Sequence, residues 1–202
     1  MPRVLRKRWA ATVIAPAAFL LTANRDIDDR ELSEANSESG GIVKIKIFSV
    51  GGTIDKVYFD KLSQYQVGFP SIRAILGSLP IAFDYEIESL LRKDSLDMNE
   101  ADRELVREHV AAEPCRKIII THGTDTMVET GKSLRRVGGR CIVLTGAMEP
   151  ADFKSSDAVF NVGVAVGAVS SLPNGVYIAM NGSIFDPFKC RKNRDLGIFE
   201  EL

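Results

Sequence analysis

Histidine and cysteine are both scarce in this sequence, which contains two histidines and three cysteines among 202 residues. Cys115, Cys141 and Cys190 are odd in number and form no CxxC pair, so they indicate neither a disulfide framework nor a zinc ribbon. The two histidines, His109 and His122, are too few for a histidine-based metal site, and no other cluster of metal ligands stands out. We therefore expect no metal centre.

The sequence also lacks an excess of either charge, since its formal net charge is -1 at pH 7. A nearly neutral chain gives no reason to expect nucleic acid or another polyanion as a partner. The phosphate-binding patterns GxGxxG and GxxxxGK[ST] are absent as well, which argues against a nucleotide-binding protein. Hydrophobic residues make up 45% of the chain and charged residues 26%, as is typical of one soluble globular domain.

Residues 1–41 differ in composition from the rest of the chain. Basic residues near the start precede an apolar stretch over 9–23, and a polar, acidic segment follows over 24–41. A basic and then apolar start resembles a secretory signal, and the polar segment is typical of a disordered linker. Alternatively, these residues come from an upstream start and the protein begins near Val43. We expect a signal-like or disordered extension over 1–41, a folded domain over 42–202, no membrane association, and a cytoplasmic location, or export if residues 1–23 act as a signal peptide.

Strand and helix patterns alternate along residues 43–180. Residues 43–50 alternate between apolar and polar side chains, while Ile118–Ile120 and Cys141–Leu144 are continuous apolar runs typical of strands buried on both faces. A further strand is predicted over 176–180. Helices are predicted over 99–112, 126–137 and 157–172, the first of them capped by Asn99 and Asp102. This alternation predicts an α/β fold, a three-layer α/β/α sandwich around a mostly parallel sheet.

Polar residues gather where these predicted strands end. Thr53 follows Gly51-Gly52, the cluster Thr121-His122-Gly123-Thr124-Asp125-Thr126 follows the isoleucine run, and Thr145 follows the next strand. Ligands of open α/β sheets bind at this edge. The residues over 124–126 have an alternative role as caps of the next helix, because Thr and Asp are preferred capping residues.

Two of these threonines, Asp125 and Lys192 have the chemistry of a nucleophile and its base. A threonine hydroxyl is a weak nucleophile until a neighbouring group takes its proton, and a lysine oriented by an aspartate is one such group. Backbone amides beside the glycines would complete an oxyanion hole. Alternatively, Lys192 is one of several solvated basic residues near the C-terminus.

The motifs Gly51-Gly52-Thr53-Ile54 and Thr121-His122-Gly123-Thr124-Asp125-Thr126 together resemble the two signatures of bacterial-type L-asparaginases. Further matches follow in the same order along residues 43–202: Asp94-Ser95-Leu96-Asp97-Met98, Thr145-Gly146-Ala147-Met148-Glu149-Pro150, Ser156-Asp157, Phe160-Asn161, Met180-Asn181 and Lys192. The resemblance implies a flavodoxin-like fold, the N-terminal catalytic domain of the family over residues 42–202, and a cofactor-free amidohydrolase that converts L-asparagine to L-aspartate and ammonia.

The resemblance also implies a role for each matching residue. Thr53 corresponds to the nucleophile that forms a threonyl acyl-enzyme, and Thr124 to a second threonine served by Asp125 and Lys192. Ser95 corresponds to the serine that holds the substrate α-carboxylate, and Asp125 also contacts the α-amine. The remaining expected substrate-binding residues are Gly52, Asp94 and Gly123. The activating tyrosine of the family lies on the loop after the first threonine, where we favour Tyr58, with Tyr65 as the alternative.

Two departures from the family pattern bear on function. Leu96 stands where the family usually has glutamine after the substrate-binding serine, and the chain ends at Leu202, where the first of two family domains ends. The sequence is therefore expected to be a short-chain form with the N-terminal domain only, which binds L-asparagine weakly and forms a homo-oligomer. The alternatives are a catalytically weak amino-acid-binding domain and an amidotransferase-type subunit.

Overall fold

A six-stranded sheet forms the centre of the computed structural model, which describes residues 43–59 and 64–202. The strands lie in the order β4-β1-β5-β6-β7-β8, and all neighbours are parallel except β7 and β8. Their bounds are β1 Lys44–Gly51, β4 Asp84–Lys93, β5 Lys117–Thr121, β6 Cys141–Thr145, β7 Gly175–Met180 and β8 Ser183–Phe185.

The strand order confirms the predicted flavodoxin-like fold. Counted along the chain, the five parallel strands have the order 2-1-3-4-5, which is that of flavodoxin-like proteins. From β1 the chain crosses to β4 on one side and then returns to β5 on the other. The carboxyl ends of β1 and β5 therefore flank the topological switch point, where open α/β sheets bind their ligands.

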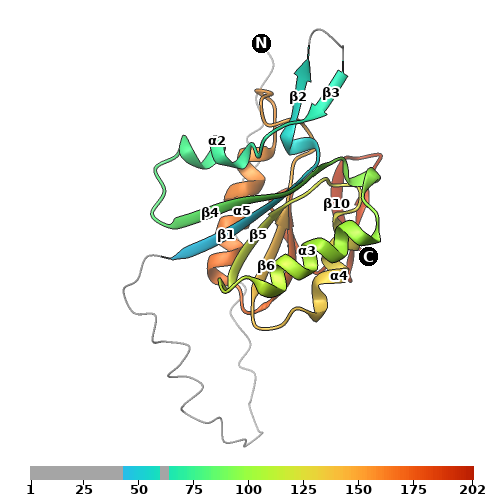
Figure 1. The fold of residues 1–202 in the computed structure, drawn as a ribbon. Coiled ribbons are helices and arrows are strands. Elements are labelled where there is room, and N and C mark those ends of the chain that lie inside the picture. The colour runs from blue at the N-terminus through green and yellow to red at the C-terminus, as the bar shows by residue number, and fades with distance from the viewer. Residues whose placement is uncertain (1–42, 60–63) are drawn as a thin grey trace, which may run out of the picture. The chain divides into compact units, whose positions relative to one another are not determined.

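Helices cover both faces of the sheet (Figure 1), with α3 and α4 on one face and α5 on the other. The helices are α2 Ile72–Gly77, α3 Glu100–Ala112, α4 Met127–Ser133, which continues as the 3-10 helix η3 Leu134–Arg136, and α5 Ala158–Ser171. The predicted capping box is confirmed: Asn99 Oδ1 accepts from the Asp102 amide at 3.0 Å, and the Asp102 carboxylate accepts from the Asn99 amide at 3.0 Å.

The isoleucine run of β5 contributes to two hydrophobic cores. Ile119 packs with residues of α2 and α5 on one face of the sheet, while Ile118 and Ile120 pack with α3 and α4 on the other. All three are fully buried. Successive side chains of a strand point to opposite faces, so an unbroken apolar run is the pattern that a strand covered on both faces requires.

Three segments differ from the sequence-based expectation. The segment after Thr53, expected to be a loop, forms a hairpin of β2 Lys56–Phe59 and β3 Gln64–Val67. The polar C-terminal segment forms a second hairpin of β9 Cys190–Asn193 and β10 Ile198–Glu201, which carries Lys192. The short strand β8 adds an antiparallel edge to the sheet.

The predicted signal-like or disordered extension over residues 1–41 lies outside the described residues. Within residues 43–59 and 64–202, no helix has the length and apolar character needed to cross a bilayer. The same residues contain no group of three or more His, Cys, Asp or Glu side chains arranged to hold a metal ion.

Candidate active site

Two glycines bring the loops after β1 and β5 into direct contact. A β-carbon at Gly52 would lie 2.3 Å from the Gly123 Cα, and a β-carbon at Gly123 would lie 2.6 Å from the Ser95 side chain. Gly52 also has φ +92°, a conformation that side chains other than glycine's rarely adopt. These close contacts stack residues 52, 123 and 95, which are three of the predicted site residues.

Thr53 begins the 3-10 helix η1 (Thr53–Asp55) directly after Gly52, and its side chain is half-buried. Its hydroxyl forms no hydrogen bond with the described part of the chain. Asp55, the last residue of η1, holds this turn in place. It accepts hydrogen bonds from Ser49 Oγ at 2.9 Å and from the Ser71 amide at 2.7 Å. Burial raises the pKa of Asp55 to about 6, although both hydrogen bonds oppose the shift.

Lys192 joins the two polar residues that follow β5. Its Nζ donates to Thr124 Oγ1 at 2.7 Å and to Asp125 Oδ1 at 3.0 Å. The Thr124 side chain is buried, and that of Lys192 is 14% exposed. The alternative in which Lys192 is a solvated surface residue is therefore wrong.

The alternative in which residues 124–126 cap helix α4 is also wrong. Thr126 occupies the position before the helix, but its side chain makes no capping hydrogen bond. Its hydroxyl instead donates to the Ser95 carbonyl at 2.8 Å. This bond ties the loop after β5 to the loop after β4.

Ser95 and Asp94 lie on that third loop, at the start of the 3-10 helix η2 (Ser95–Asp97). The Ser95 hydroxyl is buried against Gly123 and has no hydrogen-bond partner among the described residues. Asp94 accepts from the Leu96 amide at 3.1 Å and pairs with Lys56 Nζ at 2.6 Å. Burial alone would raise the pKa of Asp94, but the bonds from Lys56 and Leu96 and the charges of Lys56 and Lys192 outweigh it and lower this pKa.

The hairpin after Thr53 carries both candidate tyrosines. Tyr58 on β2 and Tyr65 on β3 face each other in the register of the antiparallel pair. Backbone position therefore does not separate the favoured Tyr58 from its alternative Tyr65.

His122, which the sequence left without a role, supports the site from within the core. It is fully buried; its Nδ1 lies 2.7 Å from the Gly123 carbonyl and its Nε2 lies 2.8 Å from Thr130 Oγ1. A carbonyl only accepts, so the Nδ1–H tautomer follows, with Nε2 accepting from the threonine. Burial lowers the pKa of His122 to about 4, so the ring is neutral at pH 7 and fixes the Gly123 peptide.

Thr145 does not join the cluster, although the sequence predicted hydroxyls at three strand ends. Its hydroxyl donates to the Ala179 carbonyl at 2.9 Å and holds β6 to β7.

The C-terminal hairpin is positioned by two asparagines that sequence reasoning recognised only as motif matches. Asn161 Oδ1 accepts from the Asn181 amide at 3.0 Å, and Asn181 Oδ1 accepts from the Phe199 amide at 2.9 Å. Phe199 pairs with Lys192 across the hairpin. Side-chain amides therefore connect α5 and the end of β7 to β10, the strand that pairs with the one carrying Lys192.

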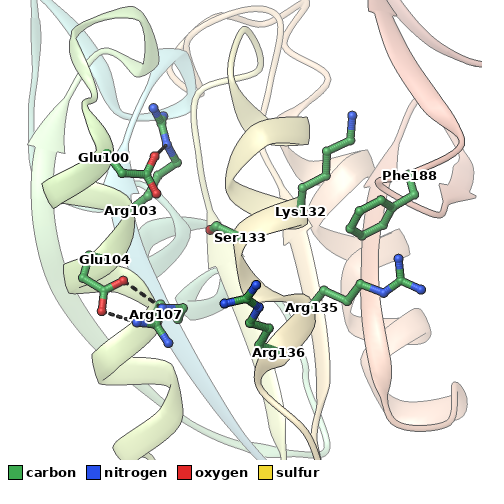
Figure 2. A pocket seen from close by; sticks show the side chains of 9 residues that line it. All are labelled: Glu100, Arg103, Glu104, Arg107, Lys132, Ser133, Arg135, Arg136 and Phe188. Atoms are coloured by element: carbon green, nitrogen blue, oxygen red, sulfur yellow. Dashed lines mark hydrogen bonds and ion pairs between the residues drawn. The ribbon is translucent and has the colours of Figure 1, made fainter.

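A surface pocket of about 480 Å³ lies between α3 and α4, and none of its lining residues is a predicted site residue. Figure 2 shows its charged walls. On α3, Arg103 and Arg107 pair with Glu100 and Glu104, each three residues earlier, an ordinary arrangement on exposed helices. Across the pocket, the Arg135 guanidinium lies 4.4 Å from the centre of the Phe188 ring. Arg135 and Arg136 lie in the last turn of η3, where basic residues interact favourably with the helix dipole.

The fold and this geometry define a class: a flavodoxin-like α/β domain with a threonine–lysine–aspartate cluster at its switch point. The family described as "Asparaginase, N-terminal" matches residues 44–198. The chain therefore belongs to the asparaginase family.

The relatives of this chain include both asparaginases and amidotransferase subunits. It is 32% identical over 162 residues to a probable periplasmic L-asparaginase of Haemophilus influenzae, covering 73% of this chain and 46% of the relative. It is also 32% identical over 171 residues to a glutamyl-tRNA(Gln) amidotransferase subunit from Methanococcus vannielii, covering 78% of this chain and 39% of the relative. The chain thus spans less than half the length of both.

Solved structures agree with the fold assignment. The thermostable L-asparaginase from Thermococcus kodakarensis superposes with a TM-score of 0.69 at 26% identity, covering 79% of this chain and 51% of that one.

Proposed function

We propose that this protein is an amidohydrolase that converts L-asparagine to L-aspartate and ammonia through a threonyl acyl-enzyme. One observation carries the proposal: Lys192 Nζ contacts both Thr124 Oγ1 and Asp125 Oδ1 beside the stacked loops of Gly52 and Gly123. A buried hydroxyl bonded to a lysine that is held by a carboxylate is suited to moving a proton.

In the proposed reaction, Thr53 Oγ1 attacks the carbon of the substrate side-chain amide. The proton of Thr53 passes to the departing nitrogen, and the C–N bond breaks. Ammonia departs, and the acyl group remains bound to Thr53 as an ester. Water then attacks this ester while the Thr124–Lys192 pair takes one of its protons. The bond between the acyl carbon and Thr53 Oγ1 breaks, and the same proton passes to Thr53 Oγ1, which releases L-aspartate and restores the hydroxyl. Tyr58 assists the first step in this scheme, with Tyr65 as its alternative.

The surrounding groups support the binding of an amino-acid amide. The Ser95 hydroxyl, which lacks a described partner, is suited to donate to the substrate α-carboxylate. Asp125 is the proposed contact of the α-amine, and Asp94, Gly52 and Gly123 shape the same loops. Backbone amides near the two glycines are the proposed oxyanion hole. Removal of one donor from such a hole lowers kcat by about 100- to 1,000-fold.

Ammonia release by the full chain tests the proposal, with L-asparagine and L-glutamine offered separately. We expect turnover of L-asparagine that falls by at least about 100-fold in Thr53→Ala and in Lys192→Ala. Undiminished turnover in either folded variant would overturn the assigned role of that residue.

A second candidate function is that of an amidotransferase component, which the similarity to the Methanococcus vannielii protein favours. Faster ammonia release from L-glutamine than from L-asparagine would support this candidate. A third, an amino-acid-binding domain without turnover, would show substrate binding that survives Thr53→Ala and no ammonia release in any variant.

A further inference from the structure

Arg194 shares a carboxylate oxygen with Lys192. Its Nε lies 3.3 Å from Asp125 Oδ1, the same atom that accepts from Lys192 Nζ at 3.0 Å. None of the family motifs recognised in the sequence includes Arg194.

Lys192 lies on β9, and Arg194 is the first residue of the turn that follows this strand. Both side chains reach Asp125. Neighbouring side chains of a strand point to opposite faces, and the residues on either side of Lys192 bond elsewhere: Arg191 Nε donates to Glu200 Oε1 at 2.8 Å, and Asn193 Nδ2 donates to Glu200 Oε2 at 3.3 Å. Lys192 and Arg194 therefore serve the site, while Arg191 and Asn193 hold the hairpin together.

A structured turn holds Arg194 in place. Asn193 Oδ1 accepts from the amides of Asp195 and Leu196, both at 3.2 Å. Gly197 then closes the turn with φ +63°, a conformation that glycine adopts without strain. The Arg194 side chain remains 66% exposed, so it is able to meet a ligand that enters from solvent.

The charges around Asp125 reduce its attraction for the α-ammonium group that it is proposed to contact. Asp125 is contacted by two side-chain nitrogens, and Asp94 is paired with Lys56 at 2.6 Å. An α-ammonium that approached Asp125 would be the third basic nitrogen around one carboxylate. A carboxylate on the substrate meets the opposite situation, with the Ser95 hydroxyl and the Arg194 guanidinium both available to it as donors.

We propose that Arg194 is a specificity-determining residue that weakens selection for a free α-ammonium group. The substrate class of the site is then the monoamides of dicarboxylic acids, with or without an α-amine, rather than L-asparagine alone. This inference rests on the proposed amidohydrolase function and names the substrate class of the same site.

The test compares L-asparagine with succinamate, which is the same molecule without the α-amine. The ratio of their kcat/KM values is measured for the full chain, for Arg194→Gln, and for Arg191→Gln as a matched control on the opposite face of the hairpin. We expect hydrolysis of both substrates by the unmodified chain and a rise of about two- to fivefold in the ratio, in favour of L-asparagine, for Arg194→Gln alone. This range corresponds to the modest energies of exposed ion pairs.

A second measurement separates this inference from the proposed function. If the full chain releases ammonia from neither substrate, the proposed function fails, and the affinities of L-aspartate and succinate are measured by calorimetry on the same three proteins. The expected result is a higher ratio of L-aspartate affinity to succinate affinity for Arg194→Gln alone. The difference in this ratio between the variants should become smaller at high salt. An unchanged ratio in Arg194→Gln, in turnover or in binding, overturns the inference.

Discussion

Gly52 lies so close to Gly123 that a β-carbon on Gly52 would stand 2.3 Å from both the Cα and the amide nitrogen of Gly123. The loop that carries Thr53 is thus held directly against the loop that carries Thr124 and Asp125. We expect Gly52→Ala to cost about 1–3 kcal/mol of unfolding free energy, because it adds both a backbone clash and strain at φ +92°, and to lower kcat/KM by more than about tenfold through displacement of Thr53.

Gly163 on α5 provides the matched control for this substitution. A β-carbon there meets no heavy atom within 4 Å, and alanine is a better helix former than glycine by about 0.5–1 kcal/mol. Gly163→Ala should therefore maintain or raise stability and leave kcat/KM unchanged. Chemical denaturation measures the unfolding free energy of both variants, and steady-state kinetics measure their kcat/KM. Equal values for the two variants would contradict the assigned role of the Gly52–Gly123 contact.

The hydroxyls of Thr124 and Thr145 follow neighbouring strands but are expected to have different functions. Thr124 Oγ1 accepts from Lys192, whereas the Thr145 hydroxyl donates to the Ala179 carbonyl. Valine replaces threonine with little change of shape, so Thr124→Val should lower kcat by about 100-fold or more while the fold persists. Thr145→Val should instead cost about 1 kcal/mol of unfolding free energy and leave most of kcat. A loss of kcat in Thr145→Val equal to that in Thr124→Val would argue against this division.

Much of the fold follows from local pattern. The isoleucine run over 118–120 indicates a strand with both faces covered, Asn99 and Asp102 mark the start of α3, and the glycines and threonines at strand ends indicate which edge of the sheet carries chemistry. Each of these signals is local and depends on side-chain direction or capping, which a few neighbouring residues determine. The structure agrees with the first two, and it brings the loops of Gly52 and Gly123 into contact at that edge.

The contacts that complete the candidate site are not local, and the sequence alone did not indicate them. Lys56 pairs with Asp94, and Arg194 lies beside Asp125, across 38 and 69 positions of the chain. Polar side chains carry no periodic signal of burial, so the sequence does not predict the C-terminal hairpin. Likewise, Tyr58 and Tyr65 follow Thr53 by five and 12 residues, and only a side chain placed against substrate would decide between them.

Asp55 and His122 are buried titratable groups with opposite effects on stability between pH 4 and pH 6. The pKa of Asp55 is raised to about 6, so the folded state binds its proton more tightly than the unfolded state, and its contribution is lost as pH rises toward 6. The pKa of His122 is lowered to about 4, so the unfolded state binds the extra proton, and stability is lost as pH falls below about 6.5. Each shift corresponds to about 3 kcal/mol, and the two slopes oppose each other.

Removing one of these groups should reveal how the unfolding free energy depends on pH through the other group. Asparagine at position 55 keeps an acceptor for the Ser71 amide and supplies a donor to Ser49, so we expect Asp55→Asn to raise the unfolding free energy near pH 7. Between pH 4 and pH 6.5 its stability should rise with pH, because the opposing contribution of Asp55 is gone while that of His122 remains, whereas the unmodified chain should show a flatter profile. Urea denaturation at half-unit pH intervals measures both profiles, and identical slopes would contradict the assignment of these two groups.

Tyr58 and Tyr65 share one hairpin, and the proposed mechanism distinguishes between them. The expected activating residue is Tyr58, five residues after Thr53, so Tyr58→Phe should lower kcat by about 100-fold through loss of a proton-transferring hydroxyl. Tyr65→Phe should retain most of the activity, because its hydroxyl has no step to perform in that scheme. Single-turnover kinetics with L-asparagine measure the acylation step directly; a large loss confined to Tyr65→Phe would transfer the role to Tyr65, and full activity in both variants would remove tyrosine from the mechanism.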